Sequence, residues 1–159
     1  MRKQYGFSLI ELLIVVSIIL IIAAITVPNL LRSRIAANEA SAVGSLRILN
    51  TSESIYNTTY GFFTCTLTDL GPPTGGTLPS STAAALIDNK LATGNKSGFS
   101  FTAGSCTSSN GFITTYQWLA DPAAPGTSGS RHFCTDETLQ IRVDPNSAAN
   151  CLSIGSPVG

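Results

Sequence analysis

The chain has 159 residues, of which only 11% are charged, and its nine basic residues balance its nine acidic ones. That length suits one modest domain together with an anchoring segment. A neutral chain without a basic patch is not expected to take nucleic acid as its main ligand. The single histidine, His132, and the absence of a C-x-x-C pair argue against a zinc site.

A long apolar segment lies near the N-terminus. It runs from Phe7 to Val27, follows a short leader that contains Arg2 and Lys3, and includes Glu11 as its only charged residue. A helix of about 20 mostly apolar residues crosses the hydrocarbon layer of a membrane, so this segment is long enough to span one.

Two ordinary interpretations of such a start leave Glu11 unexplained. A secretory signal peptide would use the small residues 24–26 as a cleavage site, but the apolar run is longer than usual and an acid is unfavourable within it. A plain anchor helix has no use for an acid, which costs about 2.5–3.5 kcal/mol at the bilayer centre. Near the helix N-terminus that cost is smaller, since the helix dipole favours negative charge there.

The segment Gly6-Phe7-Ser8-Leu9-Ile10-Glu11-Leu12-Leu13 resembles the class III signal of the type IV pilin and pseudopilin family. The resemblance is close from Arg2 to about Asn38 and covers only the general layout beyond. It implies that a prepilin peptidase cuts between Gly6 and Phe7 on the cytoplasmic side and methylates the new N-terminal Phe7. It also assigns Glu11 to assembly, as the acid that meets the N-terminal amine of a neighbouring subunit.

Elementary electrostatics agrees with this assignment. A free amine on Phe7 has a reference pKa near 8 and is mostly charged at neutral pH. An amine and a carboxylate buried in an apolar bundle are costly alone and tolerable as a pair. Two staggered chains can form that pair more easily than one straight helix can.

The apolar segment is predicted to continue as one helix to about Tyr60, with a kink or a locally melted turn near Ala23 to Pro28. From Asn29 the pattern becomes amphipathic. A stripe predicted to pack on a sheet consists of Ile35, Ala42, Leu46, Leu49 and Tyr56. The charged residues fall mainly on other faces, as solvated groups or as ionic contacts between subunits; they are Arg32, Arg34, Glu39, Arg47 and Glu53.

The second half of the chain changes from loop and helix to strands. A connecting region over 62–97 contains a loop at 71–76 and a short helix, capped by Ser80 or Ser81, that reaches Leu91 and ends before Gly94. Alternating and β-branched residues then predict strands over 98–103, 112–119, 131–135 and 139–143. The remaining tail is expected to be coil.

The four cysteines are expected to form two disulfides in an oxidising compartment. Three connectivities are possible. We favour Cys65–Cys106 and Cys134–Cys151, because these pairs are sequential and close short loops.

Catalytic and metal-binding patterns are not evident. No G-x-S-x-G or C-x-x-C motif surrounds a nucleophile, and Asp136 and Glu137 are adjacent acids of a turn or strand. Asp144 and Asn146 supply too few oxygen ligands for calcium. We therefore expect no enzyme, no metal and no obligatory cofactor.

The resemblance implies an α+β, type IV pilin-like fold, in which the C-terminal half of a long N-terminal helix packs on a small antiparallel sheet. The expected parts are a leader (1–6), a membrane or filament-core helix (7–28), an amphipathic helix (29–60) and a globular domain (61–159).

The expected function is a structural subunit of a type IV pilus-like filament. Such a subunit is a single-pass precursor in inner-membrane lipid, is processed by prepilin peptidase, and then assembles with other copies and the pilus machinery into an extracellular filament. Two alternatives stay open: a pseudopilin of a type II secretion system, and a secreted or membrane-tethered, disulfide-stabilised binding protein.

Overall fold

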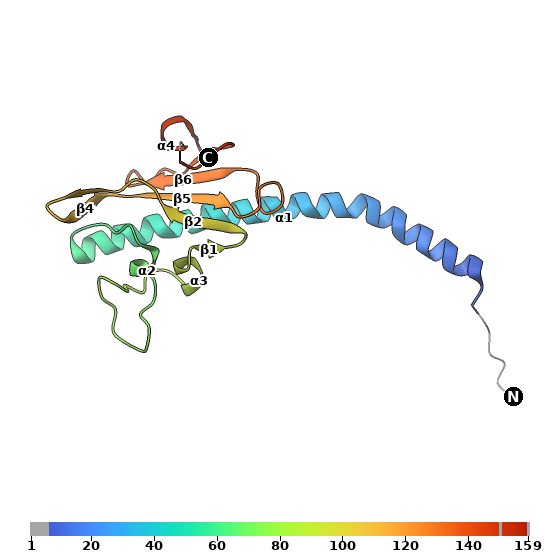
Figure 1. The fold of residues 1–159 in the computed structure, drawn as a ribbon, viewed down its shortest axis with the longest axis horizontal. Helices are drawn as coiled ribbons and strands as arrows, with labels where there is room; N and C mark the ends of the chain where they lie inside the picture. Colours follow the sequence, from blue (N-terminus) through green and yellow to red (C-terminus); the bar gives the residue numbers. More distant parts are fainter. Residues whose placement is uncertain (1–6, 150, 159) are drawn as a thin grey trace. The chain divides into compact units, whose positions relative to one another are not determined.

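The computed structural model describes residues 7–149 and 151–158 (Figure 1). The first element is the helix α1 (Leu9–Tyr60), whose residues divide between two units, one ending at Arg34 and the other beginning at Ile35. The predicted end of the helix is confirmed. Gly61 follows with a φ of 86°, and its N–H donates to the Asn57 carbonyl at 2.8 Å, which stops the helix.

The unit from Ile35 onward contains a six-stranded antiparallel sheet in the order β1-β2-β5-β6-β7-β8 and a separate two-stranded hairpin, β3-β4. The sheet strands are β1 (Asn95–Lys96), β2 (Phe99–Ala103), β5 (Gln117–Pro122), β6 (His132–Asp136), β7 (Arg142–Asp144) and β8 (Ser156–Pro157). The hairpin consists of β3 (Thr107–Ser109) and β4 (Phe112–Thr115), and three one-turn helices complete the unit, α2 (Leu67–Leu70), α3 (Asn89–Ala92) and α4 (Cys151–Ile154).

The second half of α1 covers one face of this sheet (Figure 1). Four members of the predicted stripe, Ala42, Leu46, Leu49 and Tyr56, are buried, and Ile35 is half-buried. The sheet contributes large buried side chains to the same core, namely Phe99, Phe101, Trp118, Ala120 and Phe133. The predicted α+β class and the packing of an amphipathic half-helix on an antiparallel sheet are confirmed.

The single strand predicted over 112–119 is wrong, because the chain changes sheets at Tyr116. Residues before it pair with β3, and residues after it pair with β2 and β6. The Gln117 side chain folds over the turn that leaves β2: its Oε1 accepts the Ser105 N–H at 2.9 Å, and a Cβ on Gly104 would lie 2.4 Å from it. A glycine at 104 and this glutamine thus let the hairpin diverge from the sheet.

The helix predicted from Ser80 or Ser81 is also wrong in its start. Only Asn89–Ala92 are helical, and the cap is Asp88, whose Oδ1 accepts the Leu91 N–H at 3.0 Å. Upstream, the N–H groups of Ala84 and Leu86 donate to carbonyls of Asp69 and Leu70 instead of forming a helix. The connecting region is held by these long-range bonds to α2, a helix absent from the sequence prediction.

Two further boundaries differ. The last predicted strand starts later, at Arg142, because Leu139 adopts a φ of 63° and its N–H closes a turn on the Asp136 carbonyl at 2.9 Å. The tail is not coil. It forms α4 and then β8, which pairs with β7 at the edge of the sheet.

Candidate functional site

The N-terminal end of α1 carries the predicted assembly residues. Phe7 is 80% exposed, while Gly6 and the Gly6–Phe7 bond lie outside the described residues. Ser8 precedes the first helical residue, and its backbone N–H donates to Oε2 of Glu11 at 3.1 Å. An acid three residues after a serine that returns to the serine N–H is one half of a capping box. Glu11 therefore stabilises the start of its own helix.

The sequence contains the signal for this cap. Ser8-Leu9-Ile10-Glu11 has the S-x-x-E spacing that marks helix starts, which we did not identify from the sequence. Among the described residues, no group donates a hydrogen bond to Oε1 of Glu11. One carboxylate oxygen is thus committed to the cap and the other is available to a second chain.

The uncharged polar side chains from Ser17 to Ser33 donate back to their own helix. Ser17 Oγ donates to the Leu13 carbonyl at 2.7 Å, and Thr26 Oγ1 donates to the Ile22 carbonyl at 3.0 Å. Asn29 and Ser33 make the same bond one turn back. This arrangement suits an apolar solvent, in which every polar group needs an internal partner.

The apolar side chains of this unit are exposed around the whole helix. Their exposed fractions range from 41% at Leu31 to 80% at Leu9, with Val16, Leu20 and Ile25 between these values. The segment is long and apolar enough to cross a membrane by length and composition. A surface of this kind needs lipid or other chains to cover it.

Pro28 lies inside the helix rather than at an end. It has no N–H to donate to the Ala24 carbonyl, so one bond of the helical ladder is missing there. The helix is nonetheless continuous from Ala23 to Pro28. The predicted kink at Pro28 stays a prediction.

In the second half of α1, two acids that we expected among the solvated charges are buried. Glu39 is 4% exposed and Glu53 is fully buried, whereas Arg32, Arg34 and Arg47 are exposed as predicted. The sequence did not predict that these two acids are buried, because helix periodicity does not reveal which N–H groups of other segments donate to the helix. Each carboxylate contacts a loop or strand that the helix itself does not specify.

Glu39 holds the loop between β5 and β6. Its Oε1 accepts the backbone N–H groups of Ser130 and Arg131 at 2.9 and 3.1 Å, and its Oε2 pairs with the Arg131 guanidinium at 2.7 Å. Burial alone raises the pKa of Glu39, but the hydrogen bonds and charge of Ser130 and Arg131 outweigh it, so that pKa lies below its ordinary value. The buried acid is thus kept ionised.

Glu53 has no such cation among the described residues. Its Oε2 accepts the Thr64 N–H at 3.1 Å and its Oε1 accepts the Trp118 Nε1–H at 3.0 Å. Burial raises the pKa of Glu53 to about 7, although both hydrogen bonds act in the opposite direction. The two buried acids of one helix therefore have opposite pKa shifts.

Asn50 forms the polar centre between these acids. Its Nδ2 donates to Thr135 Oγ1 at 2.8 Å and to the Leu139 carbonyl at 3.2 Å, while its Oδ1 accepts the Tyr116 hydroxyl at 3.2 Å. A buried network with all its groups satisfied specifies how the helix sits on the sheet. Its burial also makes Asn50, within an Asn-x-Ser sequence, inaccessible as a modification acceptor.

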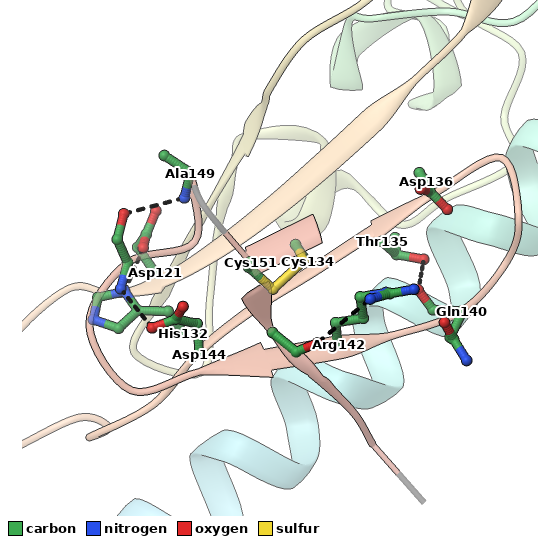
Figure 2. The surroundings of a disulfide bond; sticks show 12 residues. Asp121, His132, Cys134, Thr135, Asp136, Gln140, Arg142, Asp144, Ala149 and Cys151 are labelled. Carbon is green, nitrogen blue, oxygen red and sulfur yellow. Dashed lines mark hydrogen bonds and ion pairs between the residues drawn. A yellow bond between two sulfur atoms is a disulfide. The ribbon is translucent and has the colours of Figure 1, made fainter. Parts of the chain in front are cut away.

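Both disulfides join the pairs that the spacing favours, Cys65 with Cys106 and Cys134 with Cys151. Figure 2 shows the second of these, which connects β6 to α4 and lies between Arg142 and the hydrogen-bonded pair of His132 and Asp121. The bond attaches the tail to the centre of the sheet, and the other attaches the connecting region to the β3-β4 hairpin. The two disulfides thus close covalent loops with sequence separations of 41 and 17 residues.

The remaining acids form local structure. Asp144 Oδ1 accepts the N–H groups of Asn146 and Ser147, and Asp136 Oδ1 accepts the Thr138 N–H at 3.0 Å, so both close turns. Across residues 7–149 and 151–158, His, Cys, Asp and Glu side chains form no group that could hold a metal ion.

Comparisons with known proteins point to the N-terminus. The family model of the prokaryotic N-terminal methylation motif matches residues 1–27. The chain is 59% identical over 39 residues to the type IV wide pilus major component PilA4 of Thermus thermophilus, which covers 24% of this chain and 30% of that protein. It is 41% identical over 56 residues to the type II secretion system core protein G of Vibrio cholerae, covering 35% of this chain and 38% of that protein.

The chain thus matches about a third of the length of these curated relatives, and each match covers only a minority of its own residues. Residues 1–27 thus carry the prokaryotic N-terminal methylation motif, and the N-terminal segment is similar to those of a type IV pilus component and a type II secretion system protein. An α+β unit, consistent with a type IV pilin-like fold, follows this segment.

Proposed function

We propose that this protein is a structural subunit of a type IV pilus-like filament. One observation carries the proposal: the part of α1 before Arg32 exposes apolar side chains on all sides and contains one acid, Glu11, which lies four residues after Phe7 within the matched methylation motif. The subunit waits in the inner membrane as a precursor, is cut between Gly6 and Phe7, and is methylated on Phe7. It then exchanges lipid for the helices of other copies in an extracellular filament.

In this mechanism Glu11 has two roles in succession. Before assembly, its Oε2 caps its own helix through the Ser8 N–H. In the filament, the carboxylate also accepts a hydrogen bond from the charged amine of a neighbouring Phe7, because the two charges are costly to bury alone and are tolerated in an apolar bundle as a pair. The pilus assembly machinery and the prepilin peptidase are the expected partners, and no catalytic step is assigned to the subunit.

Two substitutions separate these roles. Glu11→Gln keeps an acceptor oxygen for the Ser8 N–H but removes the charge, whereas Glu11→Ala removes both. If pairing with the amine drives assembly, both variants are cleaved and inserted normally, and both form no filaments by electron microscopy. Normal filaments of Glu11→Gln would reduce Glu11 to a capping residue and contradict the assembly role.

The cleavage site is tested by mass spectrometry of the intact assembled subunit. The expected mass is that of a chain beginning at a methylated Phe7. Assembled material that still contains Arg2 and Lys3 would contradict the processing step. A start near Val27 would instead support a secreted, disulfide-stabilised protein.

The match of 56 residues to a type II secretion system core protein favours a second candidate, a pseudopilin. Both candidates use the same helix and the same Glu11. Deleting the gene and scoring surface filaments and secreted enzymes separately distinguishes them: loss of filaments supports the pilus subunit, and loss of secretion alone supports the pseudopilin.

A further inference from the structure

The apolar half of α1 ends at a belt of two arginines, Arg32 and Arg34. Both are exposed, and neither has an ion pair or hydrogen-bond partner among the described residues. The next acid along the chain, Glu39, is buried and occupied by Arg131 and Ser130. The belt therefore carries two positive charges that its own chain does not neutralise.

The uncharged polar side chains of the same segment differ from these two arginines in their hydrogen bonding. Ser17, Thr26, Asn29 and Ser33 donate their side-chain hydrogens to carbonyls of the same helix. These groups need no ligand outside the helix. Arg32 and Arg34 are the first positively charged side chains after Ser8, and their N–H groups remain available to an anion outside the chain.

The helix length places the belt at a membrane surface. From Leu9 to Leu31 the helix measures about 35 Å at 1.5 Å per residue. The hydrocarbon layer is about 30 Å thick, so Arg32 begins where that layer ends and its long side chain reaches the headgroups. Arg2 and Lys3, the basic residues of the leader, precede the other end of this apolar segment.

The angular position of the two arginines favours lipid over a protein partner. Two residues apart on an α-helix, their side chains diverge by about 200° around the axis, so they leave opposite sides of the helix. A neighbouring subunit contacts one side, whereas a leaflet surrounds the helix and offers phosphates to both. Guanidinium groups bind phosphate oxygens in a bidentate manner.

We propose that Arg32 and Arg34 bind the phosphate groups of phospholipids on the non-cytoplasmic face of the inner membrane. They hold the subunit at a fixed depth before assembly. After removal of Arg2 and Lys3, they are the basic residues that flank the apolar run. This inference rests on the membrane-inserted stage of the proposed function and does not require that filaments form.

The test measures the proximity of phosphorus to the guanidinium carbons. The full chain, with ¹³C-labelled arginine, is reconstituted in vesicles of phosphatidylethanolamine and phosphatidylglycerol in phosphate-free buffer. Solid-state NMR then records the dephasing of each Cζ signal by ³¹P. We expect dephasing at Arg32 and Arg34, loss of each signal in Arg32→Gln or Arg34→Gln, and loss of all dephasing in vesicles of a phosphate-free glycolipid.

Arg47 is the matched control, since it is an exposed arginine of the same helix without an ion-pair partner in the described chain. We expect no dephasing there. Absence of dephasing at both belt residues, or equal dephasing at Arg47, overturns the inference. If Arg32 and Arg34 show dephasing but the protein forms no filaments in cells, the inference stands and only the proposed function fails. If filaments form but neither arginine shows dephasing, the proposed function stands and the inference fails.

Discussion

The two halves of α1 differ in where the hydrogen bonds of their polar side chains end. Between Ser17 and Ser33, these bonds end on carbonyls three or four residues back in the same helix. In the second half, five serine and threonine hydroxyls also donate back to carbonyls of the helix, but Glu39 and Asn50 bond to groups 66 to 92 residues further along the chain. The first half completes its own hydrogen bonding, whereas the buried Glu39 and Asn50 of the second half depend on the rest of the unit.

This difference shows what each half is built to contact. A helix that satisfies its polar groups alone can move between lipid and other apolar helices without losing bonds. A helix with buried acids is committed to one partner, because separation would expose unsatisfied charges on one side and donors on the other. Mutations should therefore change the stability of the packed unit through the second half and leave it unchanged through the first.

The largest expected effect comes from Glu39→Ala. The change removes the acceptor of three backbone and side-chain N–H groups at the β5–β6 loop and breaks the ion pair with Arg131. We expect the free energy of unfolding to fall by about 4 kcal/mol, because the Ser130 and Arg131 N–H groups lose a charged acceptor worth about 1.5–3 kcal/mol per hydrogen bond. The ion pair itself adds little, since the Arg131 side chain is 54% exposed. Urea denaturation in detergent, monitored by the fluorescence of Trp118, measures this change in the free energy of unfolding.

Arg47→Ala is the control for Glu39→Ala, because Arg47 is exposed on the same helix and should change the unfolding free energy by less than about 0.5 kcal/mol. A loss at Glu39 no larger than the loss at Arg47 would show that the two halves do not differ in this way.

A slightly smaller effect is expected from Cys134→Ser. The bond to Cys151 closes a loop with a sequence separation of 17, and loss of such a loop constraint costs about 3 kcal/mol. We expect the tail and β8 to become sensitive to protease. Thiol labelling of the wild-type protein supplies the check, since reagent uptake at Cys134 or Cys65 without a reductant would argue against both disulfides.

Glu53→Gln tests whether the two buried acids give the stability of the protein opposite dependences on pH. The folded pKa of Glu53 is about 7 and its ordinary value is 4.5, so the folded state binds the proton more tightly than the unfolded state. Stability from this group is therefore full below pH 4.5 and is lost as the pH rises to about 7, by up to roughly 3 kcal/mol. Glutamine does not titrate, so the stability of the variant should not fall between pH 4.5 and pH 8 as that of wild type does. Its single acceptor oxygen satisfies only one of the two donors, Thr64 N–H and Trp118 Nε1–H, so the variant starts from a lower stability.

Glu39 has the opposite dependence. Its folded pKa is lowered, so its contribution is present above the ordinary glutamate pKa and is lost as the pH falls through the folded value. Thermal denaturation from pH 3 to pH 9 of wild type and Glu53→Gln measures the difference. Parallel curves for the two proteins above pH 4.5 would show that Glu53 does not titrate in this window.

The smallest effect uses two asparagines of the same helix. Asn50→Ala removes the centre of a buried network and should cost about 2 kcal/mol, because Thr135 and Tyr116 lose their partner. Asn29→Ala removes a bond to its own helix and should change the stability of the packed unit by less than about 0.5 kcal/mol. Equal losses in chemical denaturation would contradict the division of α1.

The sequence predicted those features that depend on local composition. Phe7 to Tyr60 is predicted as one helix because only Pro28 and Gly44 oppose it, and Tyr60-Gly61 provides its end. The strand β2 follows from the alternation of its buried side chains. The methylation motif, too, is a local pattern, which explains why the comparisons agree with it.

Errors arose where distant groups decide the backbone. Residues 84–87 have a helical composition, yet their N–H groups bond to the end of α2, so the helix starts only after Asp88. The strand over 112–119 is divided because β4 pairs with β3 while β5 continues the main sheet. Local propensity cannot report which of two competing partners a backbone group meets.

By itself, the sequence determined the apolar helix and its single acid, because a continuous run of side chains of one kind needs no tertiary partner to be recognised. Only the tertiary structure decided that Glu39 and Glu53 are buried and that their pKa values shift in opposite directions. The periodicity of the helix places both acids on its surface, but burial and the available donors depend on loops that fold back from more than ten residues away.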